Sequence, residues 1–230
     1  EFRRVLFRSK LEPLDADPGA ADRGIIIHEA LDAFVRAFPK ALPPDALARL
    51  LDIGRRSFGA LLERPTIWAF WWPRFEAIAR WVVAHEADRR RTVMPIAAEA
   101  KGELELPAEG RPFVLRARAD RIDRLPDGTL AVIDYKTGSV PKMPDICDGF
   151  SPQLQLEAAI IQAGGFADVP AAAVAELCYW KLSAGDPAGE EIPVAGTFGR
   201  DKRPVPPPPE LAAAADRKST RLNSSHGYIS

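Results

Sequence analysis

The hydrophobic pattern of this chain changes its period near residue 95, and this change limits the folds open to the chain. Up to that point, apolar residues recur at spacings of three, four and seven, which is typical of helices with one buried face. Beyond it, several short segments alternate between apolar and polar residues or run apolar, as strands do. The pattern therefore predicts a helical N-terminal segment followed by a region that contains a sheet.

Three helices are expected before residue 95. The first covers about 24–38, with Asp22 as its N-cap. The second opens at Pro43 and Pro44 and continues to about residue 62. The third runs over about 66–90 and is dense in aromatic residues, and Pro73 is expected to kink or divide it. Aromatic side chains in such number most simply form part of a core, and a docking face for further domains is the alternative.

Strands are expected over 96–106, 112–123, 129–135 and about 173–182. The residues Pro-Asp-Gly at 126–128 indicate a hairpin turn between the second and third of them. A helix is expected over about 151–163, ended by two glycines, and residues 184–209 are expected to form a loop and a linker. Together these elements predict an α/β fold in which a mixed central sheet is flanked by helices.

The two ends of the chain read as opposite strands of one DNA element. Residues 1–9 (EFRRVLFRS) can be written as GAG TTC AGA CGT GTG CTC TTC CGA TCT. The reverse complement of that DNA, translated from its second base, gives DRKSTRLNS, which is the sequence of residues 216–224. The element resembles a sequencing-library adapter. We therefore treat residues 1–9 and 216–230 as foreign and expect the natural part to be an internal fragment.

The remaining bulk properties favour a chain from a reducing compartment. No apolar run approaches the length of a membrane span, and the N-terminus lacks the order of a signal peptide. The two cysteines, Cys147 and Cys178, make a disulfide framework unexpected. The expected location is the cytoplasm.

Two carboxylates and a lysine come together at the end of the predicted 129–135 strand. Asp134 and Lys136 lie two residues apart, so their side chains leave the same face of one strand. Asp120 lies on the preceding strand, across the turn, and can converge on that face. Tyr135 points away and can pack, while its carbonyl remains available as an oxygen ligand. Such a set can bind Mg²⁺, and Lys136 can orient or deprotonate a water molecule or neutralise a transition state. This is the chemistry of phosphodiester hydrolysis.

The order of these residues resembles the PD-(D/E)xK nucleases. Asp120 followed by IDYKTG at 133–138 is similar to their catalytic pattern, and the DYKTG form resembles their RecB-like branch. Residues 24–31 (GIIIHEAL) are similar to that branch's G-x-x-x-H-x-x-L helix, which implies that His28 is a metal ligand. Residues 151–157 (SPQLQLE) are similar to its Q-x-x-x-Y helix, which implies that Gln153 contacts DNA or the site. Glu157 stands where tyrosine is usual.

The resemblance implies a restriction-endonuclease-like core that acts on DNA, single-stranded or at unwound duplex ends. Its cofactor would be Mg²⁺, for which Mn²⁺ can substitute, held by His28, Asp120, Asp134 and the Tyr135 carbonyl. Residues 69–75 (AFWWPRF) and 151–154 (SPQL) resemble the C-terminal nuclease domain of the AddB family of helicase–nuclease subunits. That likeness implies the resection of double-strand breaks together with an AddA-type partner subunit. Some members carry an iron–sulfur cluster on four cysteines, which the two cysteines here do not support.

The net charge bears on how such a domain would hold DNA, and the resemblance also gives an expected domain layout. Without the adapter-like ends, the 31 basic and 32 acidic residues of the whole chain become 25 and 30, a net charge of −5. Because a domain that grips DNA by itself usually has a basic excess, we expect a local patch or neighbouring domains to hold the DNA. The expected layout is a linker over 10–21, the nuclease domain over 22–200, and a Pro-rich linker with the start of a truncated helix over 201–215.

Several residues have two interpretations. Glu99 is a further acidic ligand or a solvent-facing strand residue, and Gln153 has a role in the site or simply lies on an amphipathic helix. Asp123 is expected to form a salt bridge or a turn. Arg116, Arg118, Arg121 and Arg124 contact phosphates or pair with the acidic strand at 99–105. Two other functions stay open, a stand-alone RecB-like or Cas4-like exonuclease and a non-catalytic scaffold that binds DNA ends.

Overall fold

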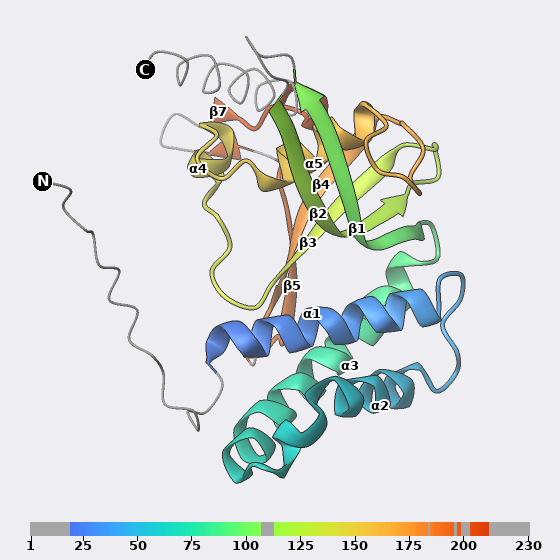
Figure 1. Ribbon diagram of the computed structural model, residues 1–230, viewed down its shortest axis with the longest axis vertical. Coiled ribbons are helices and arrows are strands. Elements are labelled where there is room, and N and C mark those ends of the chain that lie inside the picture. Colours follow the sequence, from blue (N-terminus) through green and yellow to red (C-terminus); the bar gives the residue numbers. More distant parts are fainter. Residues whose placement is uncertain (1–18, 107–112, 184, 196, 199–202, 212–230) are drawn as a thin grey trace, which may run out of the picture.

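A computed structural model describes residues 19–106, 113–183, 185–195, 197–198 and 203–211. Both adapter-like ends and residues 10–18 of the expected linker lie outside these residues. A five-stranded sheet has helices on both faces, which confirms the predicted fold class (Figure 1). The helices α1 (Ala20–Ala37), α2 (Ala46–Phe58) and α3 (Trp72–Arg89) gather on one face, and α5 (Gln153–Gln162) packs against the other.

The first two helices begin elsewhere than the sequence suggested. Asp22 is not the N-cap of α1. Gly19 is, and its amide donates to the Asp22 carboxylate over 2.7 Å. An acidic residue at the third helical position can reach back to the cap in this way, so α1 starts at Ala20, inside the expected linker. Helix α2 begins after Asp45 and ends at Phe58, where a 3-10 turn (Gly59–Glu63) takes over.

The aromatic helix contains one irregular turn. A π-helical turn (Ile67–Trp71) leads directly into α3, and the Trp72 amide donates to the Ile67 carbonyl, five residues back. Pro73, which follows, has no amide to donate and needs room for its ring, and the wider π turn provides that room. The expected division of this helix therefore lies just before the proline.

The strands follow the order β1-β2-β3-β4-β5 across the sheet. Their bounds are β1 (Met94–Leu106), β2 (Phe113–Arg124), β3 (Leu130–Lys136), β4 (Val174–Leu182) and β5 (Gly189–Pro193). Only β3 and β4 pair in parallel, and the chain between them contains α4 (Met143–Cys147) and α5. The sequence did not predict α4, β5, β6 (Thr197–Phe198) or β7 (Arg203–Pro204). The expectation of only loop and linker over 184–209 is therefore wrong, because short strands rich in glutamate, glycine and proline carry no clear alternation.

Each face of the sheet has its own apolar core. Ile133 and Tyr135 of β3 face α1, α2 and α3, whereas Val132 faces α5. The aromatic helix is divided in the same way: Trp72 and Phe75 are buried, while Trp68 and Phe70 are 52% and 64% exposed. The interpretation of this helix as core is thus right for part of its aromatic residues.

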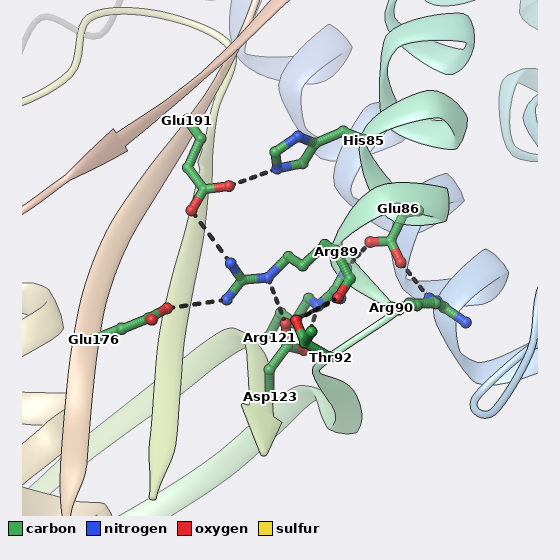
Figure 2. Close-up of polar contacts among 9 residues, drawn as sticks. All are labelled: His85, Glu86, Arg89, Arg90, Thr92, Arg121, Asp123, Glu176 and Glu191. Carbon is green, nitrogen blue, oxygen red and sulfur yellow. Dashed lines mark hydrogen bonds and ion pairs between the residues drawn. The ribbon is translucent and has the colours of Figure 1, made fainter. Parts of the chain in front are cut away.

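A buried ion network joins α3 to the sheet (Figure 2). We call Glu86, Arg89, Arg121 and Asp123 the helix–sheet network. The fully buried Arg121 donates to Asp123 over 2.6 Å and also contacts Glu86. Arg89 bonds the second Asp123 oxygen over 3.0 Å and extends to Glu191 and Glu176. Asp123 is therefore a salt-bridge residue, as predicted, and Arg121 is unavailable to a phosphate.

Unlike Arg121, two other arginines of β2 pair with acidic residues of β1. Arg116 bonds Glu103 over 2.8 Å, and Arg118 forms an ion pair with Glu99. Both arginines are largely exposed.

None of the helices among the described residues combines the length and the apolar character needed to cross a bilayer.

Candidate active site

Three polar side chains lie level with one another on neighbouring strands of the sheet: those of Asp120, Asp134 and Tyr179. Arg121 of β2 pairs with Ile133 of β3, so Asp120 lies level with Asp134. Asp134 in turn pairs with Tyr179 of β4. Because side chains alternate along a strand, Asp134 shares the α5 face with Val132. The hairpin and the parallel crossover thus bring the two predicted aspartates to one place on one face.

Glu99 extends this row onto β1. The register places Ala98 opposite Arg121 and Ala100 opposite Ala119, so Glu99 lies level with Asp120. Its φ of 49° lies in the left-handed region, which is uncommon for a residue other than glycine. Its side chain is only 9% exposed, although its partner Arg118 is 60% exposed. We call Glu99, Asp120 and Asp134 the carboxylate row.

Helix α1 brings His28 to the row. His28 Nδ1 lies 3.4 Å from Asp120 Oδ2, and the imidazole meets the Tyr135 ring edge-on. One turn earlier in the helix, Gly24 allows this approach, because a Cβ there would lie 2.9 Å from Thr137 Oγ1. The glycine and the histidine of the G-x-x-x-H pattern therefore serve one purpose, the close contact of α1 with the end of β3.

Tyr135 takes part through its backbone amide. That amide donates to Asp120 Oδ2 over 2.7 Å and so fixes the carboxylate across the two strands. The tyrosine ring lies on the opposite face of the sheet, in the core beneath the N-terminal helices. The use of its carbonyl as a metal ligand stays a prediction.

Helix α5 supports the other end of the row. Gln153 donates from Nε2 to Asp134 Oδ1 over 2.5 Å, and its Oε1 accepts from Lys136 Nζ over 3.0 Å. Lys136 Nζ also lies 2.7 Å from Asp134 Oδ2 in an ion pair. This second oxygen is buried and accepts no well-formed hydrogen bond from any described residue. Among the described residues, this oxygen therefore meets a cation and no neutral donor.

The electrostatics of the row work against its negative charge. Burial, reinforced by Asp120, raises the pKa of Asp134 to about 6, and Lys136 only partly opposes this shift. Burial and Asp120 likewise raise the pKa of Glu99. Burial alone would lower the pKa of His28, but Asp120 and the other two carboxylates outweigh it and raise that pKa. Each shift shows crowded negative charge that a bound cation would relieve.

His28 and two acids of the row could together hold a divalent metal ion. Single ligand atoms of His28, Glu99 and Asp120 lie within 4.8 Å of one another. These residues also line a pocket of about 330 Å³, together with Gly24, Ile25 and Arg118. Oxygen ligands from two or three carboxylates suit Mg²⁺ and Mn²⁺, and the open pocket leaves room for water and a phosphate. Of the residues predicted for the site, His28, Glu99 and Asp120 line this pocket. Asp134, Lys136 and Gln153 form a second, mutually bonded group, and Tyr135 bonds Asp120 through its backbone.

Sequence reasoning gave no role to one further residue. Glu157, one turn after Gln153 on α5, accepts from Gln153 Nε2 over 3.2 Å and is almost fully buried. Burial, with Asp134 nearby, raises its pKa well above the ordinary value. Its spacing of four from Gln153 was the available signal, because such residues share one side of a helix.

Comparisons with known proteins give similar proteins and a superfamily. An uncharacterized protein of Rickettsia bellii is 28% identical over 164 residues, 71% of this chain and 20% of its own length. One of Rickettsia typhi is 27% identical over 168 residues, 71% of this chain and 19% of its own length. The chain thus spans about a fifth of the length of these relatives.

The match to a crystal structure of SSO0001 covers 88% of this chain and 74% of that chain, at 12% sequence identity. Its TM-score of 0.35 is too low to support a family assignment. The sequence model of the PD-(D/E)XK nuclease superfamily, by contrast, matches residues 2–224. With this match over nearly the whole length, the chain belongs to the PD-(D/E)XK nuclease superfamily.

Proposed function

We propose that this chain is a magnesium-dependent deoxyribonuclease domain. The observation that carries the proposal is the carboxylate row, in which crowded and largely buried acids lie beside His28 and Lys136. A row of this kind destabilises the metal-free protein, so a purely structural role does not account for it. Superfamily membership supports the same conclusion.

Each residue has a distinct part in the proposed hydrolysis. His28, Asp120, Asp134 and the Tyr135 carbonyl would hold the metal, with Glu99 as an additional ligand. The metal would neutralise phosphate charge and make bound water more acidic. Lys136, held by Gln153 and Asp134, lies at the edge of the row, where its ammonium can orient the attacking water or stabilise charge in the transition state.

We further propose that the domain belongs to an AddB-type helicase–nuclease subunit. The AFWWPRF segment and the motif order support this finer assignment. Relatives about five times longer than the matched region are compatible with a nuclease domain in a larger machine. In such a machine an AddA-type subunit would be the partner, and unwound DNA ends of a double-strand break would be the substrate.

Cleavage of single-stranded DNA tests the proposal. The wild type and Asp134→Ala are compared with Mg²⁺, with Mn²⁺ and with EDTA. Glu103→Gln, which alters an exposed ion pair on the same sheet, is the matched control. We expect metal-dependent cleavage by the wild type and the control, and none by Asp134→Ala. Equal cleavage by the wild type and Asp134→Ala would refute the catalytic assignment.

A further inference from the structure

The side-chain amide of Gln153 has its hydrogen-bonding groups occupied on both sides. Its nitrogen donates one hydrogen to Asp134 Oδ1 over 2.5 Å and the other to Glu157 Oε1 over 3.2 Å. Its oxygen accepts from Lys136 Nζ over 3.0 Å. With two acceptors for the two N–H groups, the plane of the amide is fixed, and its oxygen has to face the lysine.

Glu157 is placed where an acidic side chain is unfavourable. It is 1% exposed, and its second oxygen, Oε2, is buried and has no hydrogen-bond partner among the described residues. An apolar side chain at this position of α5 would avoid the cost of burying these polar atoms. The residue therefore does not serve the stability of the core, and its one hydrogen bond within the described part of the chain, to Gln153, indicates its purpose.

The state of Glu157 agrees with such a role. Burial raises its pKa well above the ordinary value, which favours the neutral acid near Asp134. In the neutral form Oε1 can still accept from Gln153 while Oε2 carries the proton. Glu157 can thus hold the amide without adding a fourth negative charge beside the carboxylate row.

We propose that Glu157 is a positioning residue, which holds Gln153 so that its amide keeps Asp134 and Lys136 in their catalytic arrangement. This inference rests on the proposed nuclease function. Glu157 does not reach the substrate in this scheme. It acts through Gln153, and a residue at position 157 needs only an acceptor oxygen of similar reach.

Two substitutions of Glu157 separate the effect of its hydrogen bond from the effect of its side-chain volume. Glu157→Leu keeps an apolar side chain in the buried space but removes the acceptor, and Glu157→Gln keeps the acceptor. Loss of one such hydrogen bond is expected to lower kcat about three- to tenfold for Glu157→Leu, with KM and the affinity for Mn²⁺ unchanged. For Glu157→Gln we expect kcat within about twofold of the wild type.

A matched control lies on the same helix. Gln155 is also buried, and it donates to the Ile146 carbonyl, away from the site. Gln155→Leu should lower the melting temperature without changing kcat. In a Gln153→Ala background, Glu157→Leu should have no further effect on kcat, because its only route to the site is then gone. Equal kcat for Glu157→Leu and the wild type, equal loss for Glu157→Gln, or additive losses with Gln153→Ala would each overturn the proposal.

A second measurement does not depend on cleavage. The side-chain amide protons of Gln153, observed by NMR, should exchange slowly with solvent in the wild type and Glu157→Gln and faster in Glu157→Leu. If the wild type fails to cleave DNA, the proposed nuclease function fails, and the exchange rates still decide on Glu157. Equal exchange in all three proteins would show that Glu157 does not hold the amide.

Discussion

Two groups of charged residues meet at β2, and they differ in how their charges are balanced. Asp120 belongs to the carboxylate row, and Arg121, the next residue of β2, belongs to the helix–sheet network. In the network every buried acid meets a guanidinium, and Asp123 raises the pKa of Arg89 and of Arg121 against the effect of burial. In the row, burial and mutual repulsion raise the pKa of Asp134 and of Glu99.

The difference separates a structural group of charges from a functional one. The network is complete without any ligand, so its charges are satisfied and hold α3 to the sheet. The row has two cations, Lys136 and the largely exposed Arg118, and one histidine against three carboxylates, and it opens into a pocket. Perturbed carboxylates in a pocket are typical of sites that bind or react, whereas paired buried charges are typical of structure.

The largest expected effect is on catalysis by the row. Asp134→Asn keeps the shape of the side chain and removes its charge, so a metal can no longer be held and cleavage of single-stranded DNA should fall by about a thousandfold or more. The melting temperature of the metal-free protein should not fall. A variant that lost its fold together with its activity would place Asp134 with the network instead.

The next largest effect is on stability through the network. Arg121→Met leaves Glu86 and Asp123 short of a buried partner, and the free energy of unfolding should fall by about 3–5 kcal/mol. Arg116→Met, which breaks the exposed pair with Glu103, should cost less than about 1 kcal/mol. Urea denaturation measures both. Similar losses for the two variants would show that the buried network does not differ from a surface pair.

The pH dependence of the row gives the third effect. Because the folded protein raises the pKa of Asp134 from 3.8 to about 6, the folded state keeps a proton that the unfolded state has released between these pH values. The metal-free wild type should therefore lose about 2–3 kcal/mol of stability, relative to Asp134→Asn, as the pH rises from about 4 to about 7. Denaturation of both proteins in EDTA at the two pH values measures it. A difference that stays constant with pH would contradict the crowding of charge at Asp134.

The smallest effect distinguishes two similar glutamates of β1. Glu99 and Glu103 both pair with an arginine of β2, but only Glu99 belongs to the row. Glu99→Gln should weaken the binding of Mn²⁺ about tenfold, while Glu103→Gln leaves it unchanged. Calorimetric titration measures both affinities. Equal affinities in the two variants would remove Glu99 from the ligand set.

Much of the site could be predicted because its residues follow strand periodicity. Asp134 and Lys136, two apart at the end of an apolar run, had to share a face, and the hairpin turn brought Asp120 beside them. The fold class followed from the same pattern of helices and strands. These inferences hold because they depend on local periods and short connections.

Other features depend on contacts that no local pattern contains. The left-handed backbone of Glu99 and the complete burial of Arg121 arise only when β1, β2 and α3 have packed together. The sequence therefore left Glu99 between two interpretations. For Arg121 it offered a phosphate contact or a pair with the strand at 99–105, whereas the partners of Arg121 are Glu86 and Asp123. Glu157, likewise, is recognisable as part of the site only once α5 lies against β3.

Binding of Mn²⁺ to the metal-free protein tests most directly whether the carboxylate row is a metal centre, because it depends on the described residues and not on a DNA substrate or a partner. The wild type and Asp120→Asn are titrated by calorimetry under the same conditions. We predict saturable binding to the wild type and at least about tenfold weaker binding to Asp120→Asn. The same affinity in both proteins, or no binding to the wild type, would contradict a metal centre at the row.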